Sequence, residues 1–283
     1  MPSAPVVPRP AATVLLVRDH PTPPPGRTPL QVFLQRRAAG MAFAGGMTVF
    51  PGGGVDHADR PDATHWAGPD PSWWGERFGC DPELAGALVS AAVRETFEEC
   101  GVLLAGPHLP EGTARLRAEA TVRPRAEATV RLRADLVARR RTLADVLEQE
   151  GLVLGSDLLR PWSRWITPET SPRRYDTAFF VARVPDGQEA DAHTTEAVEA
   201  TWWHPAEALE SWERGDVQLM APTHRSLQEI AEHADAASVL AAADERVIRP
   251  ILPIVRRTGA QVTVMLPGEP GFELAGEAPG SST

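Results

Sequence analysis

The chain of 283 residues contains no lysine and only two cysteines. All 28 of its basic side chains are therefore arginines, a bias that a GC-rich coding sequence explains without reference to function. Cys80 and Cys100 are too few for a disulfide framework, and they lack the spacing of a Cys/His metal site. This cysteine usage favours a reducing environment, so we expect a cytoplasmic protein.

Long hydrophobic runs are also missing. No uninterrupted apolar stretch reaches the roughly 20 residues of a transmembrane helix, and residues 1–10 lack the layout of a signal peptide. The 38 acidic residues outnumber the basic ones and give a formal net charge of −10. Because this charge repels polyanions, we expect no nucleic acid as a partner, whereas a small phosphorylated ligand remains compatible. The lack of a long apolar stretch argues against a membrane as a partner.

Strand-like and helix-like patterns alternate along the chain. Apolar or alternating segments predict strands at residues 11–18, 30–36, 47–50, 175–184 and 198–203. Helical periodicity predicts helices at residues 82–100 and 205–214, and one or two more helices at residues 226–243. The interleaved order favours a single α/β domain over residues 1–283, with insertions at about 57–80 and 107–150 and an unassigned tail from about 245.

The helix predicted at residues 82–100 carries an unusual cluster of charge. Spacings of three and four residues place Glu95, Glu98 and Glu99 on one side of the helix, where like charges repel. Glu98 and Glu99 also fall in the last turn before Gly101, where the helix dipole is already negative. A divalent cation would turn this repulsion into binding, and magnesium suits a cluster of oxygen ligands. A solvated acidic helix end is the alternative interpretation.

A glycine turn precedes this helix in the sequence. Pro51-Gly52-Gly53-Gly54 follows a short predicted strand, and glycine permits backbone geometries and close approaches that other residues do not. Phe50-Pro51-Gly52-Gly53 and the run Arg94-Glu95-Thr96-Phe97-Glu98-Glu99-Cys100-Gly101-Val102 together resemble the Nudix box. The corresponding part of that box reads Arg-Glu, two residues, Glu-Glu, one residue, Gly and an apolar residue.

The resemblance implies a fold, a cofactor and a set of site residues. The expected fold is the Nudix α/β/α sandwich, with a mixed central sheet and helical insertions. The expected cofactor is Mg²⁺, with Mn²⁺ as the alternative. By position in the box, the implied metal ligands are the carbonyl of Gly53 and the carboxylates of Glu95, Glu98 and Glu99, and Arg94 is the arginine that orients the glutamates.

The sequence departs from the uninterrupted box in two ways. The early acid position falls on Asp59 rather than on a glutamate, and a long segment replaces the short spacer before Arg94. A similar interruption occurs in a Nudix subgroup that includes peroxisomal coenzyme A diphosphatases. Residues 162–168 and 173–180 resemble the same subgroup, which is also compatible with a homodimer.

Other residues are candidates for binding and catalysis on weaker grounds. Glu95 is the first candidate for a general base, and Glu196 is either a further acidic ligand or base or a surface glutamate. Arg36, Arg173 and Arg174 are candidates for clamping substrate phosphates, with Arg37 as an alternative to Arg36. Tyr175 and Trp203 either stack on a base or belong to the core. The octets repeated over residues 116–139 predict a solvated helical insertion.

These patterns predict a magnesium-dependent hydrolase that cleaves the diphosphate linkage of a nucleoside diphosphate derivative. The subgroup resemblance favours coenzyme A or acyl-coenzyme A as the substrate and leaves NADH and ADP-ribose open. A Nudix-fold sensor that binds a nucleotide without cleaving it is the alternative of another class. The complete set of box glutamates argues against such a sensor.

Overall fold

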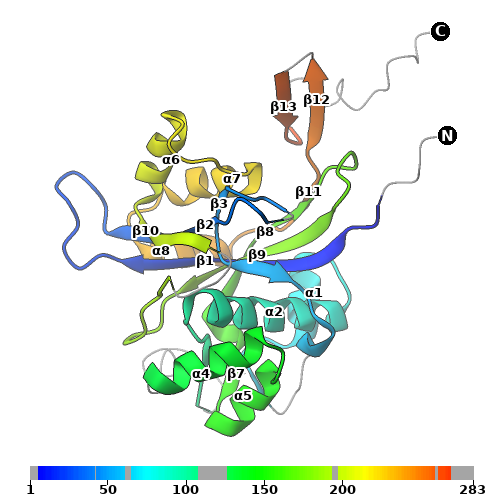
Figure 1. Ribbon diagram of the computed structural model, residues 1–283, viewed down its shortest axis with the longest axis vertical. Helices are drawn as coiled ribbons and strands as arrows, with labels where there is room; N and C mark the ends of the chain where they lie inside the picture. Colours follow the sequence, from blue (N-terminus) through cyan, green and yellow to red (C-terminus); the bar gives the residue numbers. More distant parts are fainter. Residues whose placement is uncertain are drawn as a thin grey trace.

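The computed structural model describes residues 6–41, 43–60, 65–107, 126–192, 197–258 and 261–268. Within these residues, a mixed β-sheet lies between two layers of helices (Figure 1). Its strands run in the order β10-β2-β1-β9-β8-β11, with β3 added to β2 and β4 added to β1. Their bounds are β1 Arg9–Asp19, β2 Leu30–Arg37, β3 Thr48–Val49, β4 Gly52–Gly54, β8 Leu159–Ile166, β9 Tyr175–Arg183, β10 Ala197–Trp203 and β11 Pro250–Ile251.

Strand β1 is the centre of this sheet. It pairs in parallel with β9 and antiparallel with β2 and β4. Successive side chains of a strand point to opposite faces, so Val14 and Leu16 enter one core while Leu15 and Val17 enter the other. Burial on both faces explains why the sequence of β1 is an almost continuous apolar run.

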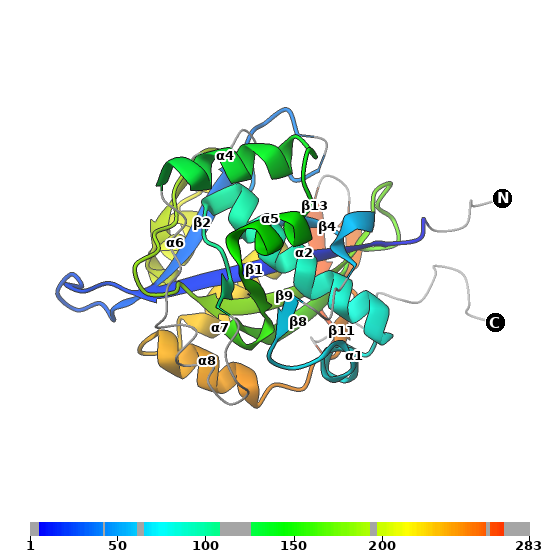
Figure 2. The same cartoon turned by 90° about the horizontal axis from the view of Figure 1, so that it is seen from below.

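Helices cover both faces of the sheet. One layer contains α1 (Pro71–Phe78), α2 (Pro82–Cys100), α4 (Ala126–Val137) and α5 (Leu143–Glu150), and the other contains α6 (Pro205–Glu213), α7 (Ala221–Ile230) and α8 (Ala236–Asp244). Figure 2, which views the first layer, shows α2 and α5 in front of β1 and β9. The predicted α/β/α sandwich with a mixed sheet is thereby confirmed.

Smaller elements occupy the insertions and the tail. The first insertion holds a 3-10 turn (η1, His57–Asp59), β5 (Trp66–Ala67) and α1; the second holds α4 and α5. Strand β7 (Val153–Gly155) joins β5 and β6 (Ala105–Gly106) in a small sheet, and a 3-10 turn (η3, Ser156–Leu158) leads into β8. The tail forms β11 and a projecting hairpin of β12 (Ile254–Thr258) and β13 (Gln261–Met265), visible in Figure 1. The repeated octets are described only from residue 126 onward.

Helix α2 begins and ends at the residues that the sequence indicates. The side chain of Asp81 accepts a hydrogen bond from the backbone N–H of Leu84, and Pro82 occupies the first turn. Gly101 ends the helix in the left-handed conformation, with a φ of 74°. Among the described residues, no helix combines the length and apolarity that crossing a bilayer requires.

Candidate active site

The glycine turn lies against the glutamates of α2. Strand β4 pairs with β1 so that Gly53 is opposite Ala12. A β-carbon at residue 53 would lie 2.6 Å from Cδ of Glu95, much closer than non-bonded carbons approach. The missing side chain of Gly53 therefore makes room for the Glu95 carboxylate. The two segments that resemble the Nudix box are far apart in the sequence, but they lie next to each other here.

Arg94 holds three carboxylates together. Its guanidinium donates two hydrogen bonds to Asp59, at 2.8 and 2.9 Å, and further bonds to Glu95 at 2.8 Å and Glu98 at 3.4 Å. It also donates to the carbonyl of Gly54 at 3.0 Å, which ties the glycine turn to the helix. Burial opposes the charged form of Arg94, but the Asp59 bond and the neighbouring carboxylates outweigh burial and raise its pKa.

Glu99 is the most deeply buried of the box glutamates, with 4% of its surface exposed. Its carboxylate accepts hydrogen bonds from the side-chain amide of Gln35 and, at 2.8 Å, from the backbone N–H of Gly52. Burial raises the pKa of Glu99 to about 8, and the negative charge of Glu95 acts in the same direction. The two donors fix the carboxylate in position without supplying a full positive charge.

Glu95 lies between Arg94 and the glycine turn. Burial raises the pKa of Glu95 to about 7, against the opposing effect of Arg94, and the charge of Glu98 raises it further. Burial likewise raises the pKa of Glu98. The box thus gathers three carboxyl groups whose charged forms are each destabilised by their surroundings.

These residues fit a divalent cation chemically. The donors are carboxylate and carbonyl oxygens, the ligands that Mg²⁺ prefers, and a cation would stabilise the charged forms that burial disfavours. Among the described residues, no three acidic, histidine or cysteine side chains are already arranged as a metal site. Arg94 bonds to Glu95 and Glu98, and Glu99 accepts a hydrogen bond from the side-chain amide of Gln35.

Two cavities meet at Glu95. One, the apolar cavity, has a volume of about 650 Å³ and is lined by the glycine turn and by side chains from β1, β8, β9 and α7. The other, the arginine cavity, has a volume of about 790 Å³ and is lined by Glu98, Glu99 and residues of the second insertion. The arginines of the second cavity are Arg94, Arg133, Arg139, Arg140 and Arg141. Both volumes are in the range of small-molecule sites.

Comparison with known proteins decides the family. A family model described as the NUDT19 Nudix domain matches residues 82–230. The chain belongs to the Nudix hydrolases. This Nudix hydrolase is 28% identical to the human acyl-coenzyme A diphosphatase NUDT19, a match that covers 92% of the chain and 79% of the human protein. It is also 28% identical to the chicken (Gallus gallus) protein of the same name, over 76% of the chain and 65% of that protein.

A solved structure agrees with this assignment. The crystal structure of a Nudix hydrolase from Alicyclobacillus acidocaldarius is 28% identical in sequence and superposes with a TM-score of 0.63. The match covers 83% of this chain and 96% of the other. The α/β architecture of the Nudix hydrolase is therefore the fold of its family.

The arginines proposed to clamp phosphates are not brought to the cavities of this Nudix hydrolase. Arg36 is exposed and pairs with Glu199 at 3.3 Å. Arg173 is exposed, whereas Arg174 is buried and donates to the backbone carbonyls of Thr167 and Val6. None of the three lines either cavity, so their substrate-binding role remains an untested prediction that the geometry does not favour. Glu196 lies outside the described residues, and its role also stays a prediction.

Arg37, the alternative to Arg36, does line the apolar cavity. Neighbouring residues of a strand point to opposite faces, so one arginine of the pair had to face away. Of the two aromatic candidates for stacking, Tyr175 lines the same cavity, and Trp203 packs against the core.

Sequence reasoning missed Gln35 and the arginines of the second insertion. Gln35 is 2% exposed in a strand whose other inward side chains are apolar, and a lone amide among them is the signal that could have identified it. Arg133 donates to the backbone carbonyl of Glu98 at 3.1 and 3.3 Å and pairs with Asp191. Because the octets repeat, the sequence alone does not distinguish Arg133 from the arginines at the same position of the other octets.

Proposed function

We propose that this Nudix hydrolase uses Mg²⁺, with Mn²⁺ as the alternative, to cleave the diphosphate linkage of a nucleoside diphosphate derivative. Coenzyme A and acyl-coenzyme A are the leading substrates, and the names of the curated relatives support this choice. The observation that carries the proposal is the contact between Glu95 and Gly53, which places the carboxylate cluster at the glycine turn. We further propose that the protein acts in the cytoplasm, with a small molecule as its partner.

The residues that would hold the cation are Glu95, Glu98, Glu99 and the carbonyl of Gly53. A divalent cation supplies charge neutralisation for the diphosphate and acts as a Lewis acid. Arg94 keeps Glu95 and Glu98 within reach of each other, and Gln35 with the N–H of Gly52 does the same for Glu99. Phosphoryl transfer depends mainly on such positioning and charge compensation.

Glu95 is the proposed proton acceptor. A water oxygen attacks phosphorus, the phosphorus–oxygen bond to the other phosphate breaks, and the water proton passes to a carboxylate oxygen of Glu95. Each product keeps one of the two phosphate groups of the diphosphate linkage. A pKa near 7 suits this role, because a general base works best when its pKa is close to the working pH.

A panel of diphosphates tests the proposal. Purified protein is incubated with Mg²⁺ and coenzyme A, acyl-coenzyme A, NADH or ADP-ribose, and the products are identified by mass spectrometry. We expect phosphopantetheine or its acyl form from the first two substrates, and a loss of at least about 100-fold in kcat for Glu98→Gln. Cleavage of ADP-ribose alone would overturn the coenzyme A assignment. Tight binding without cleavage of any of the four would identify a sensor instead.

A further inference from the structure

The last turn of α2 carries two of the proposed metal ligands. Glu98 and Glu99 both lie in this turn, directly before Cys100 and the terminating Gly101. The last carbonyl groups of a helix have no partner within the helix, and helix ends fray. A carboxylate on a fraying turn does not keep a fixed position. The order of this turn therefore decides how well the two ligands are placed for a cation.

Donors from distant parts of the chain bind the carbonyl groups of this turn. The guanidinium of Arg133, on α4, donates two hydrogen bonds to the backbone carbonyl of Glu98, at 3.1 and 3.3 Å. The backbone N–H of Asp191, beyond the end of β9, donates to the carbonyl of Cys100 at 3.0 Å. Arg133 thus holds the main chain of a proposed ligand rather than its carboxylate.

Arg133 is itself held firmly. Its surface is 5% exposed, and Leu132 and Leu136 on the same helix are buried in the core, which fixes α4 against the body of the protein. The guanidinium also donates to both carboxylate oxygens of Asp191, at 2.7 and 2.9 Å. A β-carbon at residue 101 would lie 3.0 Å from Nη1 of Arg133 and 3.0 Å from Oδ2 of Asp191. The ion pair therefore packs directly against the end of α2.

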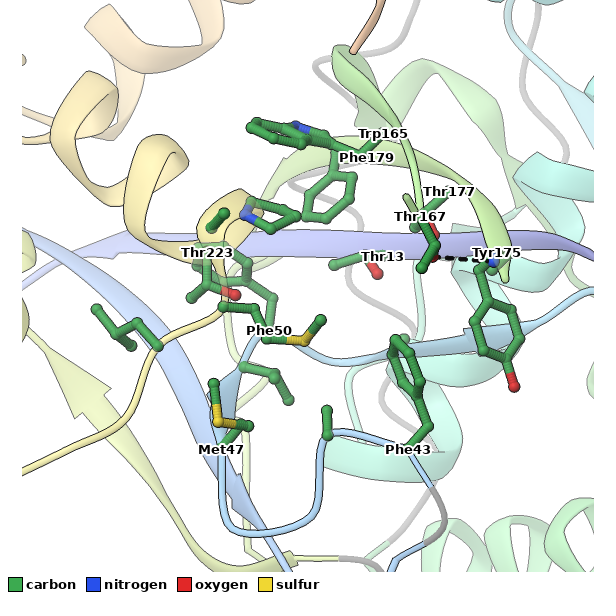
Figure 3. A pocket seen from close by; sticks show the side chains of 18 of the residues that line it. Thr13, Phe43, Met47, Phe50, Trp165, Thr167, Tyr175, Thr177, Phe179 and Thr223 are labelled. Carbon is green, nitrogen blue, oxygen red and sulfur yellow. Dashed lines mark hydrogen bonds between the residues drawn. The ribbon is translucent and has the colours of Figure 1, made fainter. Parts of the chain in front are cut away.

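The surroundings of Arg133 argue against a direct role in binding phosphate or metal. Figure 3 shows the apolar cavity, and none of its described lining residues comes from α4. Arg133 lies on the other side of Glu95, in the arginine cavity with Glu98 and Glu99. Its donors already bind a carbonyl and a carboxylate, and its positive charge opposes a cation bound to the neighbouring glutamates. The contribution that remains is the position of the last turn.

We infer that Arg133 is a positioning residue, which orders the last turn of α2 and so holds Glu98 and Glu99 in place for the cation. The inference rests on the proposed function, and it gives the second insertion a part in the reaction. Arg133 acts through the main chain of Glu98 and touches neither substrate nor metal. Hydrogen-bonding partners around metal ligands commonly contribute about 10-fold to 100-fold in metal affinity.

Titration with Mn²⁺ in the absence of substrate tests the inference. The dissociation constant is measured from the electron paramagnetic resonance signal of free Mn²⁺ for wild type, Arg133→Met and Arg133→Lys. Removal of a nearby positive charge would by itself tighten binding of the cation, whereas loss of positioning weakens it. We expect Kd to rise at least about tenfold in Arg133→Met.

Arg133→Lys gives an independent comparison, so failure of one variant to fold leaves the other. Lysine keeps the positive charge but lacks the planar fork that bonds to the carbonyl and the carboxylate together. A role of charge alone predicts no change in Kd for this variant. A positioning role predicts a rise of at least about threefold, smaller than the rise for Arg133→Met.

Arg131→Met is the matched control. It removes an arginine from the same helix, but Arg131 is exposed and is not among the described residues that line either cavity. Its Kd for Mn²⁺ should stay within about twofold of the wild-type value.

Hydrogen exchange of the cation-free proteins shows whether the effect comes from the last turn. The amide groups of residues 98–101 should exchange at least about tenfold faster in Arg133→Met than in wild type, while those of the first turns of α2 keep their protection. Arg131→Met should match wild type along the whole helix. Equal exchange of residues 98–101 in all the proteins would overturn the inference, because Arg133 would then not order the turn.

The outcomes separate the inference from the proposed function. If wild type binds no Mn²⁺ and cleaves no diphosphate, the proposed function fails and the inference fails with it. If wild type binds Mn²⁺ and cleaves coenzyme A, but both Arg133 variants bind Mn²⁺ as tightly as Arg131→Met, the inference alone fails. Tighter binding by Arg133→Met also overturns the inference, since the charge of Arg133 would then outweigh its positioning. If wild type binds Mn²⁺ without cleaving any diphosphate, the proposed function fails, and the Kd values of the variants still decide the inference.

Discussion

The carboxylate of Glu95 lies over the α-carbon of Gly53, in space that a β-carbon would need. Gly53 is outside the left-handed region, so an alanine there would suffer no backbone strain. The obstacle to a side chain at residue 53 is the end of the Glu95 side chain itself, which can rotate away. The glycine therefore serves the position of the carboxylate rather than the fold.

Gly53→Ala should thus inactivate the protein without unfolding it. We expect kcat to fall at least about 100-fold, because displacement of Glu95 misplaces both a metal ligand and the base. The thermal midpoint should change by less than about 4 °C. Gly54→Ala is the matched control, since a β-carbon there would have no described neighbour within 4 Å. Equal activity of the two variants would contradict this account of Gly53.

Arg94→Lys should lower both stability and activity. A lysine keeps the charge but cannot donate the paired bonds to Asp59, which is 2% exposed and would stay buried. We expect a loss on the order of 2 kcal/mol in urea unfolding and a fall in kcat of at least about tenfold. Arg60→Lys is the control, because Arg60 is exposed and its contact with Glu83 is 3.9 Å long. An Arg94→Lys variant with wild-type stability and activity would show that the carboxylates are held by other contacts.

The buried glutamates should make the cation-free protein less stable as pH rises. Their pKa values are raised in the folded state, from 4.5 to about 7 for Glu95 and about 8 for Glu99, mainly by burial. Above pH 4.5, the folded protein therefore binds more protons than the unfolded chain. The stabilisation of the fold by these bound protons is lost as pH rises through 7 to 8. In EDTA, we expect the thermal midpoint to fall by about 5 °C or more between pH 5.5 and 8.5.

Two comparisons identify the source of that pH dependence. Glu99→Gln, which cannot ionise, should flatten the upper part of the curve. Magnesium should flatten it in the wild type, because a bound cation favours the charged carboxylates. A steep curve that neither Glu99→Gln nor magnesium changes would place the titrating groups elsewhere.

Arg37 and Arg36 should differ in their effect on substrate binding. Arg37 lines the apolar cavity near the glycine turn, whereas Arg36 pairs with Glu199 on the surface. We expect Arg37→Ala to raise KM for acyl-coenzyme A at least about tenfold, and Arg36→Ala to change it by less than about twofold. Steady-state kinetics of the two variants provide the comparison. The reverse order would restore Arg36 as the phosphate ligand.

Local patterns predicted individual elements of the fold, and the family resemblance predicted the sandwich and the meeting of the glycine turn with the helix. Asp81, Pro82 and Gly101 carry the signals that start and end α2, and the apolar run of β1 marks it as a buried strand. The proximity of Gly53 to Glu95 was predicted because two separate segments of the sequence resemble parts of the Nudix box. Each of these inferences depends on neighbours in sequence or on a motif of fixed form.

The parts that were not predicted depend on contacts between distant segments. The choice between Arg36 and Arg37 requires knowing which face of β2 meets the cavity, and both faces are partly covered. Arg174 is buried and donates hydrogen bonds to the backbone carbonyls of Thr167 and Val6, contacts that its sequence neighbourhood does not reveal. The apolar cavity is lined by segments from Ala11 to Val264, so no single stretch of the sequence predicts it.

The bond from Arg133 to the carbonyl of Glu98 has a consequence for engineering. This guanidinium closes the carboxyl end of α2 and lies beside Gly101, where the dipole of the helix calls for a cation. Trimming the second insertion to obtain a smaller catalyst would remove that counter-charge from the turn that bears Glu98 and Glu99. A shortened version would need a replacement cation supplied from another part of the chain.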